Sequence, residues 1–109
     1  MSKIIGSETD LNKMLNECPS LLVLFYASWC PYSQRFLPIF EKYAEKTEEN
    51  LCRVLTDEIA SCKENYSIKV VPSVIFFKNG KIDKRLDGVL GRGLDENQLV
   101  EMIDSLKIG

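Results

Sequence analysis

The side chain best placed for chemistry is Cys30, which lies where an apolar run ends and a helix is predicted to begin. Unpaired N–H groups and the positive end of the helix dipole favour a thiolate at such a position. The thiolate is the form of cysteine that attacks disulfides. Pro31 suits the first turn of a helix, where no backbone donor is needed. Cys30 is therefore a candidate nucleophile for disulfide exchange, with Trp29 beside it as an apolar contact for a partner.

The other three cysteines are predicted to lie in the core, because Cys18, Cys52 and Cys62 each fall on an apolar face of a predicted element. A Cys52–Cys62 pair, or a resolving role for Cys62, is a weaker alternative. The sequence has no histidine and no two cysteines three residues apart, which argues against the common zinc sites. No metal and no cofactor is expected.

Length and composition predict a single domain over residues 1–109, since 45% of the residues are hydrophobic. The net charge of −2 and the lack of a basic cluster argue against nucleic acid as a partner. No apolar run is long enough to cross a bilayer, so no membrane is expected. The N-terminus does not resemble a signal peptide, which predicts a cytoplasmic protein with reduced thiols. A monomer is expected.

Apolar periodicity predicts strands and helices in alternation along the chain. Strands are expected at residues 3–5, 21–27, 51–56, 70–77 and 81–86, and helices after Ser7, from Pro31 to Thr47, after Asp57 and after Asp95. This alternation favours parallel strands with helices on both faces. Asn79-Gly80 is a strong hairpin signal that adds an antiparallel edge. The charged run 41–50 is predicted to be a solvated helix face, and the glycines of segment 88–93 predict a flexible connection.

The segment Trp29-Cys30-Pro31-Tyr32-Ser33, placed after an apolar strand, resembles the active-site turn of thioredoxins, Trp-Cys-x-x-Cys. Pro38, the pair Val71-Pro72 and the hairpin at 76–80 also fit at family-like spacing. The resemblance covers essentially the whole chain. It implies an α/β thioredoxin fold, with a central mixed sheet of four to five strands flanked by helices on both faces. It also implies a thiol–disulfide oxidoreductase that acts on protein disulfides.

The same resemblance assigns roles to residues. Cys30 would be the attacking cysteine. Substrate-binding residues would be Trp29, Pro31, Tyr32, Val71, Pro72 and Val89. Pro72, if its peptide bond is cis, would expose the backbone of Val71 for strand-like pairing with a substrate. The reductant would be a thioredoxin-reductase-like protein or a small thiol.

Two departures from the family pattern affect this reading. Ser33 occupies the resolving position, so Cys30 could form a mixed disulfide but would have no neighbouring thiol to release it. Leu24 stands six residues before Cys30, where thioredoxins usually bury an acid, and Arg53 takes the place of the accompanying lysine. Ser33 has two explanations: a natural monothiol form, or an engineered replacement of cysteine that traps partners.

Two other functions are kept as alternatives. Pro31-Tyr32 is similar to the Cys-Pro-Tyr-Cys turn of glutaredoxins, which would suit a monothiol glutaredoxin-like protein, although the Gly-Gly turn associated with glutathione is lacking. A non-catalytic binding module would use the same groove to hold a partner, with Cys30 at most tethering it.

Overall fold

A five-stranded mixed sheet, in the order β1-β3-β2-β4-β5, forms the centre of the molecule. The computed structural model describes residues 2–46 and 50–108, the last two of them by backbone alone. The strands are β1 (Lys3–Ile5), β2 (Ser20–Tyr26), β3 (Leu51–Leu55), β4 (Ser73–Lys78) and β5 (Lys81–Leu86). β1, β3 and β2 run parallel, whereas β4 is antiparallel to both β2 and β5. The central position of β2 explains its unbroken apolar run, because both of its faces are covered.

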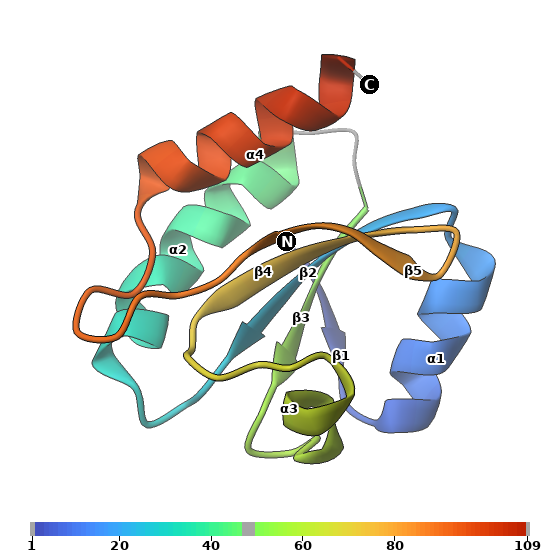
Figure 1. Cartoon of the computed structure of the whole chain (residues 1–109), viewed down its shortest axis with the longest axis horizontal. Coiled ribbons are helices and arrows are strands. Elements are labelled where there is room, and N and C mark those ends of the chain that lie inside the picture. Colours follow the sequence, from blue (N-terminus) through green and yellow to red (C-terminus); the bar gives the residue numbers. More distant parts are fainter. Residues whose placement is uncertain (1, 47–49, 109) are drawn as a thin grey trace.

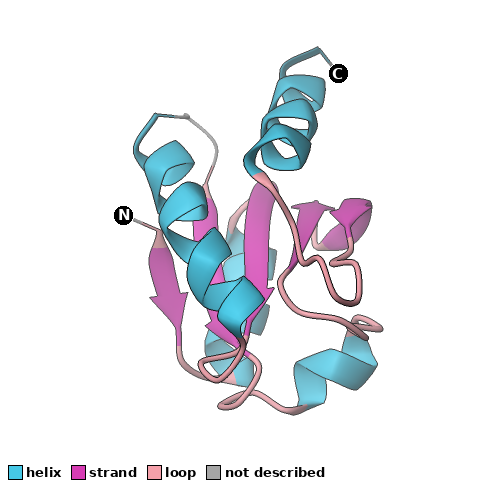
Figure 2. Cartoon of the chain, turned by 90° about the vertical axis from the view of Figure 1, so that its left-hand side faces the viewer, coloured by secondary structure: helices cyan, strands magenta, loops and turns pink. Residues whose placement is uncertain are grey.

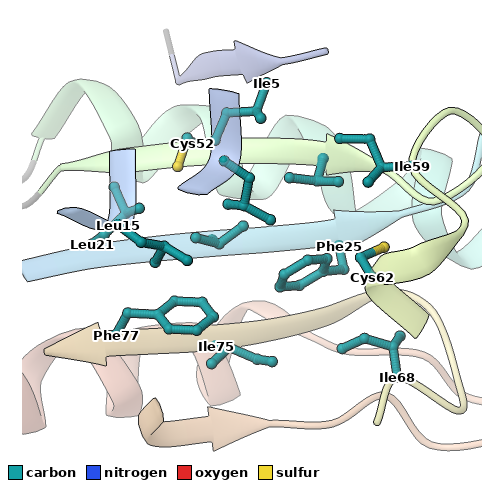
Figure 3. Close-up of a cluster of buried hydrophobic side chains, with 13 residues drawn as sticks. Ile5, Leu15, Leu21, Phe25, Cys52, Ile59, Cys62, Ile68, Ile75 and Phe77 are labelled. Atoms are coloured by element: carbon teal, nitrogen blue, oxygen red, sulfur yellow. The ribbon is translucent and has the colours of Figure 1, made fainter. Parts of the chain in front are cut away.

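Helices cover both faces of this sheet, as the sequence predicts (Figure 1). Helices α1 (Glu8–Glu17) and α3 (Ser61–Asn65) pack on one face, where side chains such as Leu15, Phe25 and Cys62 form a buried cluster (Figure 3). Helices α2 (Pro31–Lys46) and α4 (Glu96–Ile108) cover the other face. Figure 2 shows α2 crossing in front of the strands. The predicted thioredoxin-like architecture is confirmed.

Local signals fix several of the element ends. The Ser7 hydroxyl accepts a hydrogen bond from the backbone N–H of Asp10 at 3.1 Å and caps α1. Asp95 and Gln98 exchange reciprocal side-chain to backbone hydrogen bonds at the start of α4, which is a capping box. Asn79 and Gly80 both have positive φ, 53° and 80°, as a tight hairpin turn between β4 and β5 requires.

The reversed direction of β4 places the candidate site. The five residues of α3 advance the chain by only about 7.5 Å, whereas a strand as long as β3 spans about 16 Å. The chain therefore enters β4 at the edge where β2 and β3 end. The predicted strand at 70–77 is wrong at its start, because β4 begins only at Ser73, after Pro72. The segment before it stays outside the sheet, beside Cys30.

The predicted capping role of Asp57 is wrong. Residues 57–60 form turns, in which the N–H groups of Glu58 and Ile59 both bond to the carbonyl of Leu55. Helix α3 begins later, after Ala60, and has no side-chain cap. The Asp57 carboxylate instead accepts a hydrogen bond from the Ser28 hydroxyl, beside the turn that carries Cys30. The predicted end of α2 at Thr47 lies outside the described residues.

Candidate active site

Cys30 occupies the position just before the first residue of α2. Its carbonyl accepts the first helical hydrogen bond, from Gln34 N at 3.0 Å, and its own N–H donates to the carbonyl of Ala27 at 3.4 Å. The Sγ atom lies 3.8 Å from the carbonyl oxygen of Val71, at which the thiol points as a weak donor. The residue is only 5% exposed. These contacts hold the sulfur between the start of α2 and the segment that leads into β4.

The start of α2 suits negative charge on this sulfur. The N–H groups of Tyr32 and Ser33 lie in the first turn, where they have no carbonyl partner within the helix. The 16 residues of α2 align their peptide dipoles with the positive end toward Cys30. No acidic side chain occupies the first turn to oppose this field. The site can therefore stabilise the charge that develops on sulfur during disulfide exchange.

Cys30 lines a pocket of about 310 Å³. Six of the eight predicted site residues meet there: Trp29, Cys30, Pro31, Tyr32, Val71 and Val89. The sequence patterns do not predict the other lining residues, which are Lys63, Ile68, Lys69, Val70, Leu90 and Gly91. Trp29 and Leu90 are 68% and 86% exposed, which is unusual for such large apolar side chains. Uncovered apolar surface of this kind is typical of a contact site for a partner.

The other two predicted site residues, Ser33 and Pro72, do not line this pocket. Ser33 is completely buried, and its hydroxyl accepts a hydrogen bond from the backbone N–H of Ala27 at 3.1 Å. This hydrogen bond connects the first turn of α2 to the residue that follows β2. Pro72 is also buried, and the peptide bond between Val71 and Pro72 is cis.

The loop at residues 88–93 is bonded to the candidate site. The Tyr32 hydroxyl donates to the carbonyl of Gly91 at 3.0 Å, and the Arg35 guanidinium donates to the carbonyl of Arg92 at 2.9 Å. Gly93 has φ +72°, and a Cβ there would lie 2.8 Å from the Cβ of Tyr32, so only glycine fits. Figure 1 shows this orange loop beside the first turns of α2. The segment predicted as a flexible connection is thus held against α2, and its apolar tip is Leu90.

Replacing Tyr32 with phenylalanine should loosen this loop, because it removes the hydroxyl that bonds to Gly91 while keeping the ring. The lost hydrogen bond corresponds to about 0.5–1.5 kcal/mol. We expect amide hydrogen exchange at Arg92 and Gly93 to accelerate by roughly two- to tenfold. Tyr43→Phe is the matched control, since its hydroxyl bonds to Glu96 instead. Unchanged exchange in the Tyr32 variant would show that the hydroxyl does not hold the loop.

Burial disfavours the reactive thiolate form of two other cysteines, Cys52 and Cys62. All four cysteines are free thiols. Burial raises the pKa of Cys52 to about 12 and also raises the pKa of the Cys62 thiol. Both side chains lie in the cluster beneath α1 and α3 (Figure 3). Cys18 is partly buried and packs against that cluster. The predicted core positions of Cys52 and Cys62 are confirmed, whereas Cys18 is half-buried at the end of α1.

A buried ion pair lies on the α2 face of the sheet. Leu24 is completely buried and is in register with Arg53 of β3. The Arg53 guanidinium lies 3.0 Å from the Glu41 carboxylate of α2, and both side chains are less than one-fifth exposed. The backbone N–H of Ser2 donates to the same carboxylate at 2.9 Å, and the Ser2 hydroxyl bonds to it too. The prediction that segment 41–50 is a solvated face is therefore wrong at Glu41.

Partial burial alone would raise the pKa of Glu41. The hydrogen bonds from Ser2 and the charge of Arg53 outweigh that effect and hold the pKa below its usual value. Glu41 is therefore an ionised structural group at neutral pH.

In residues 2–46 and 50–108, no group of three or more His, Cys, Asp or Glu is arranged to hold a metal ion. Within the same part of the chain, no helix has the length and apolar character needed to span a bilayer.

Comparison with known sequences identifies the family. The sequence model of the Thioredoxin family matches residues 3–105. A thioredoxin of Mycoplasmoides gallisepticum is 32% identical over 103 residues, which cover 93% of this chain and 98% of the relative. Thioredoxin Y of rice chloroplasts is 36% identical over 87 residues, or 78% of this chain. The match spans only about half of that chloroplast relative, 49% of its length.

Solved structures agree with this assignment. Thioredoxin of Fasciola hepatica superposes with a TM-score of 0.83 at 26% identity, covering 94% of this chain and 97% of that structure. Thioredoxin of Plasmodium falciparum gives a TM-score of 0.86 at 24% identity, covering 94% and 97%, and supports the fold. Together with the position of Cys30 at the start of α2, these matches show that the chain belongs to the thioredoxin family.

Proposed function

We propose that the chain is a thiol–disulfide oxidoreductase that acts on protein disulfides through Cys30. The observation that carries this proposal is the position of the Cys30 sulfur. It lies at the start of a long helix, beside the Val71 carbonyl, and borders a pocket with exposed apolar walls. The relatives named thioredoxin and protein disulfide-isomerase support the same class of reaction.

The proposed reaction is an exchange of sulfur bonds. The thiolate of Cys30 attacks one sulfur of a substrate disulfide, so a bond forms between Cys30 and that sulfur while the substrate S–S bond breaks. The second substrate sulfur leaves as a thiolate and takes a proton from solvent. Trp29 and Val89 would contact the substrate chain, and the backbone of Val71 would pair with it as a neighbouring strand.

Ser33 determines where this reaction stops. A hydroxyl cannot displace the substrate sulfur, so the mixed disulfide at Cys30 persists until an external thiol attacks it. That thiol, a small molecule or a reductase cysteine, would regenerate Cys30 and carry away the substrate as a new disulfide. The residue encoded at position 33 of the natural gene distinguishes a natural monothiol protein from one whose resolving cysteine was replaced.

The compartment is part of the proposal. A cytoplasm with a thiol pool would supply the external thiol that this site needs. Relatives are named from the chloroplast and the endoplasmic reticulum. The proposal therefore rests on the chemistry of the site rather than on the location of the relatives.

Replacing Cys30 with serine should abolish the reaction with a peptide disulfide, because the chain then lacks its nucleophile. The measurement is the rate at which the peptide disulfide is consumed, followed by chromatography under native conditions. Cys18→Ser is the matched control and should react as the unchanged protein does, since Cys18 only packs against the core cluster. Consumption that continues in the Cys30 variant would contradict the proposal.

The same variant distinguishes catalysis from binding. A binding module would retain the peptide in the groove after Cys30 is replaced, with an affinity close to that of the unchanged protein. If the chain is an oxidoreductase, we expect retention to depend on the sulfur, because the covalent bond to Cys30 provides the capture.

A further inference from the structure

We infer that the groove around Cys30 selects protein disulfides whose neighbouring residues are acidic. This inference rests on the proposed function, because it names the class of substrate for the same site. The substrate is an extended segment of another protein, with its half-cystine at Cys30 and with Asp or Glu close to that half-cystine.

The charged lining of the pocket carries the inference. Lys63 and Lys69 are the only charged side chains among the residues that line the pocket, and both are exposed. Neither lysine has a carboxylate partner among the described residues. The whole chain carries a net charge of −2, so this wall has the opposite sign to the protein overall. An acidic side chain in the groove would give both ammonium groups a partner.

Two further cations flank the other side of the site. The Arg35 guanidinium lies 5.3 Å from the centre of the Tyr32 ring, and Arg92 follows the loop tip. Both arginines line the hollow adjoining the Cys30 pocket at Val89. Asp87, which precedes this loop, is engaged by Arg85 at 2.8 Å and is not free to neutralise them. Asp95 also lines this hollow, where its carboxylate accepts the hydrogen bond from Gln98 N, so two arginines face one acid there. An extended substrate therefore meets a net positive lining both in the Cys30 pocket and in the adjoining hollow.

The apolar part of the groove adds a second requirement. Trp29 precedes Cys30, Leu90 lies in the loop at residues 88–93, and both side chains are largely exposed. A substrate residue with an apolar side chain would cover them, and removing that area from water supplies affinity. The charges contribute mainly to the choice among substrates and to the rate of encounter.

The test measures the rate of mixed-disulfide formation with three symmetrical peptide disulfides. Each peptide is a dimer joined through its single cysteine, and the residues flanking that cysteine are glutamates, glutamines or lysines. The Cys30 thiolate attacks one peptide sulfur, and the other peptide leaves as a thiol, so each event gives one adduct and one free peptide. Every rate is divided by the rate of the same peptide with 2-mercaptoethanol, a neutral thiol, which removes intrinsic differences in reactivity.

We expect the glutamate peptide to react roughly three- to tenfold faster than the glutamine peptide, as a few exposed charge pairs would give. The lysine peptide should be slower than both. The preference should shrink in about 1 M salt, where the screening length falls to about 3 Å. Combining Lys63→Gln with Lys69→Gln should remove most of the preference, so that the glutamate and glutamine peptides react at similar normalised rates.

Lys78→Gln combined with Lys81→Gln is the matched control, because it lowers the net charge by the same two units. These lysines pair at the hairpin between β4 and β5, at the opposite end of β4 from Pro72. That control should keep the preference. Equal normalised rates for all three peptides, or a preference unaffected by the Lys63 and Lys69 substitutions, would overturn the inference and leave the proposed function intact. A failure of every peptide to form an adduct would instead overturn the proposed function.

Discussion

Replacing Ser33 with cysteine should convert the chain from a protein that stops at a mixed disulfide into one that turns over. The new thiol would attack the bond between Cys30 and the substrate from within the same turn of α2. Intramolecular attack has a large advantage over attack by a dilute external thiol, so we expect turnover to rise on the order of 100-fold or more. The measurement is the reduction of a protein disulfide, with the oxidised enzyme recycled by a reductase or a dithiol.

Ser33→Ala is the control for this change. It removes the hydroxyl that accepts from Ala27 N and adds no thiol. We expect no gain in turnover and a loss of about 1–3 kcal/mol in the free energy of unfolding, because a buried N–H is left without a partner. A folded Ser33→Cys protein that turns over no faster than Ser33→Ala would contradict the proposed role of position 33.

Replacing Glu41 with glutamine should give the largest loss of stability among single charge changes. Arg53 is only 12% exposed, and without Glu41 its charge would be buried with no counter-charge. Breaking such a pair costs about 3–5 kcal/mol when it is fully buried, so we expect roughly 2–4 kcal/mol here. Denaturant unfolding at neutral pH measures this difference.

The effect should depend on pH in a definite direction. The folded-state pKa of Glu41 lies below the usual value of 4.5, so its contribution is present at neutral pH and is lost as pH falls through the folded pKa. The difference between Glu41→Gln and the unchanged protein should therefore shrink below about pH 4.5. Glu17→Gln is the control, because its pair with Lys13 is 4.0 Å apart and more than half exposed. It should change stability by less than about 0.5 kcal/mol. An equal loss in both variants would contradict the account.

Local signals in the sequence predict most of the fold. The apolar run before Cys30, followed by Pro31, locates the junction of β2 and α2. Asn79-Gly80 predicts the hairpin, and the capping residues Ser7 and Asp95 predict the starts of two helices. Each of these features depends on interactions between residues that are close in sequence, so the amino-acid sequence alone is enough to predict it.

The missed features depend on contacts between distant segments. Lys63 and Lys69 enter the groove only because the short helix α3 brings the chain back to the edge of the sheet beside Cys30. Leu90 joins it because the Tyr32 hydroxyl holds the loop at residues 88–93. Glu41 looked like one of several solvated acids, and only the packing of α2 against the sheet brings it to Arg53. No local pattern carries this information.

In the proposed reaction Cys30 alone attacks a disulfide, and the reaction stops at the mixed disulfide. The direct measurement is intact-protein mass spectrometry after incubation with an equimolar peptide disulfide, followed by digestion to locate the adduct. We expect one peptide per chain, attached at Cys30, that persists until a small thiol is added and then disappears. An adduct at Cys18, Cys52 or Cys62, or a Cys30 adduct that resolves without added thiol, would contradict it.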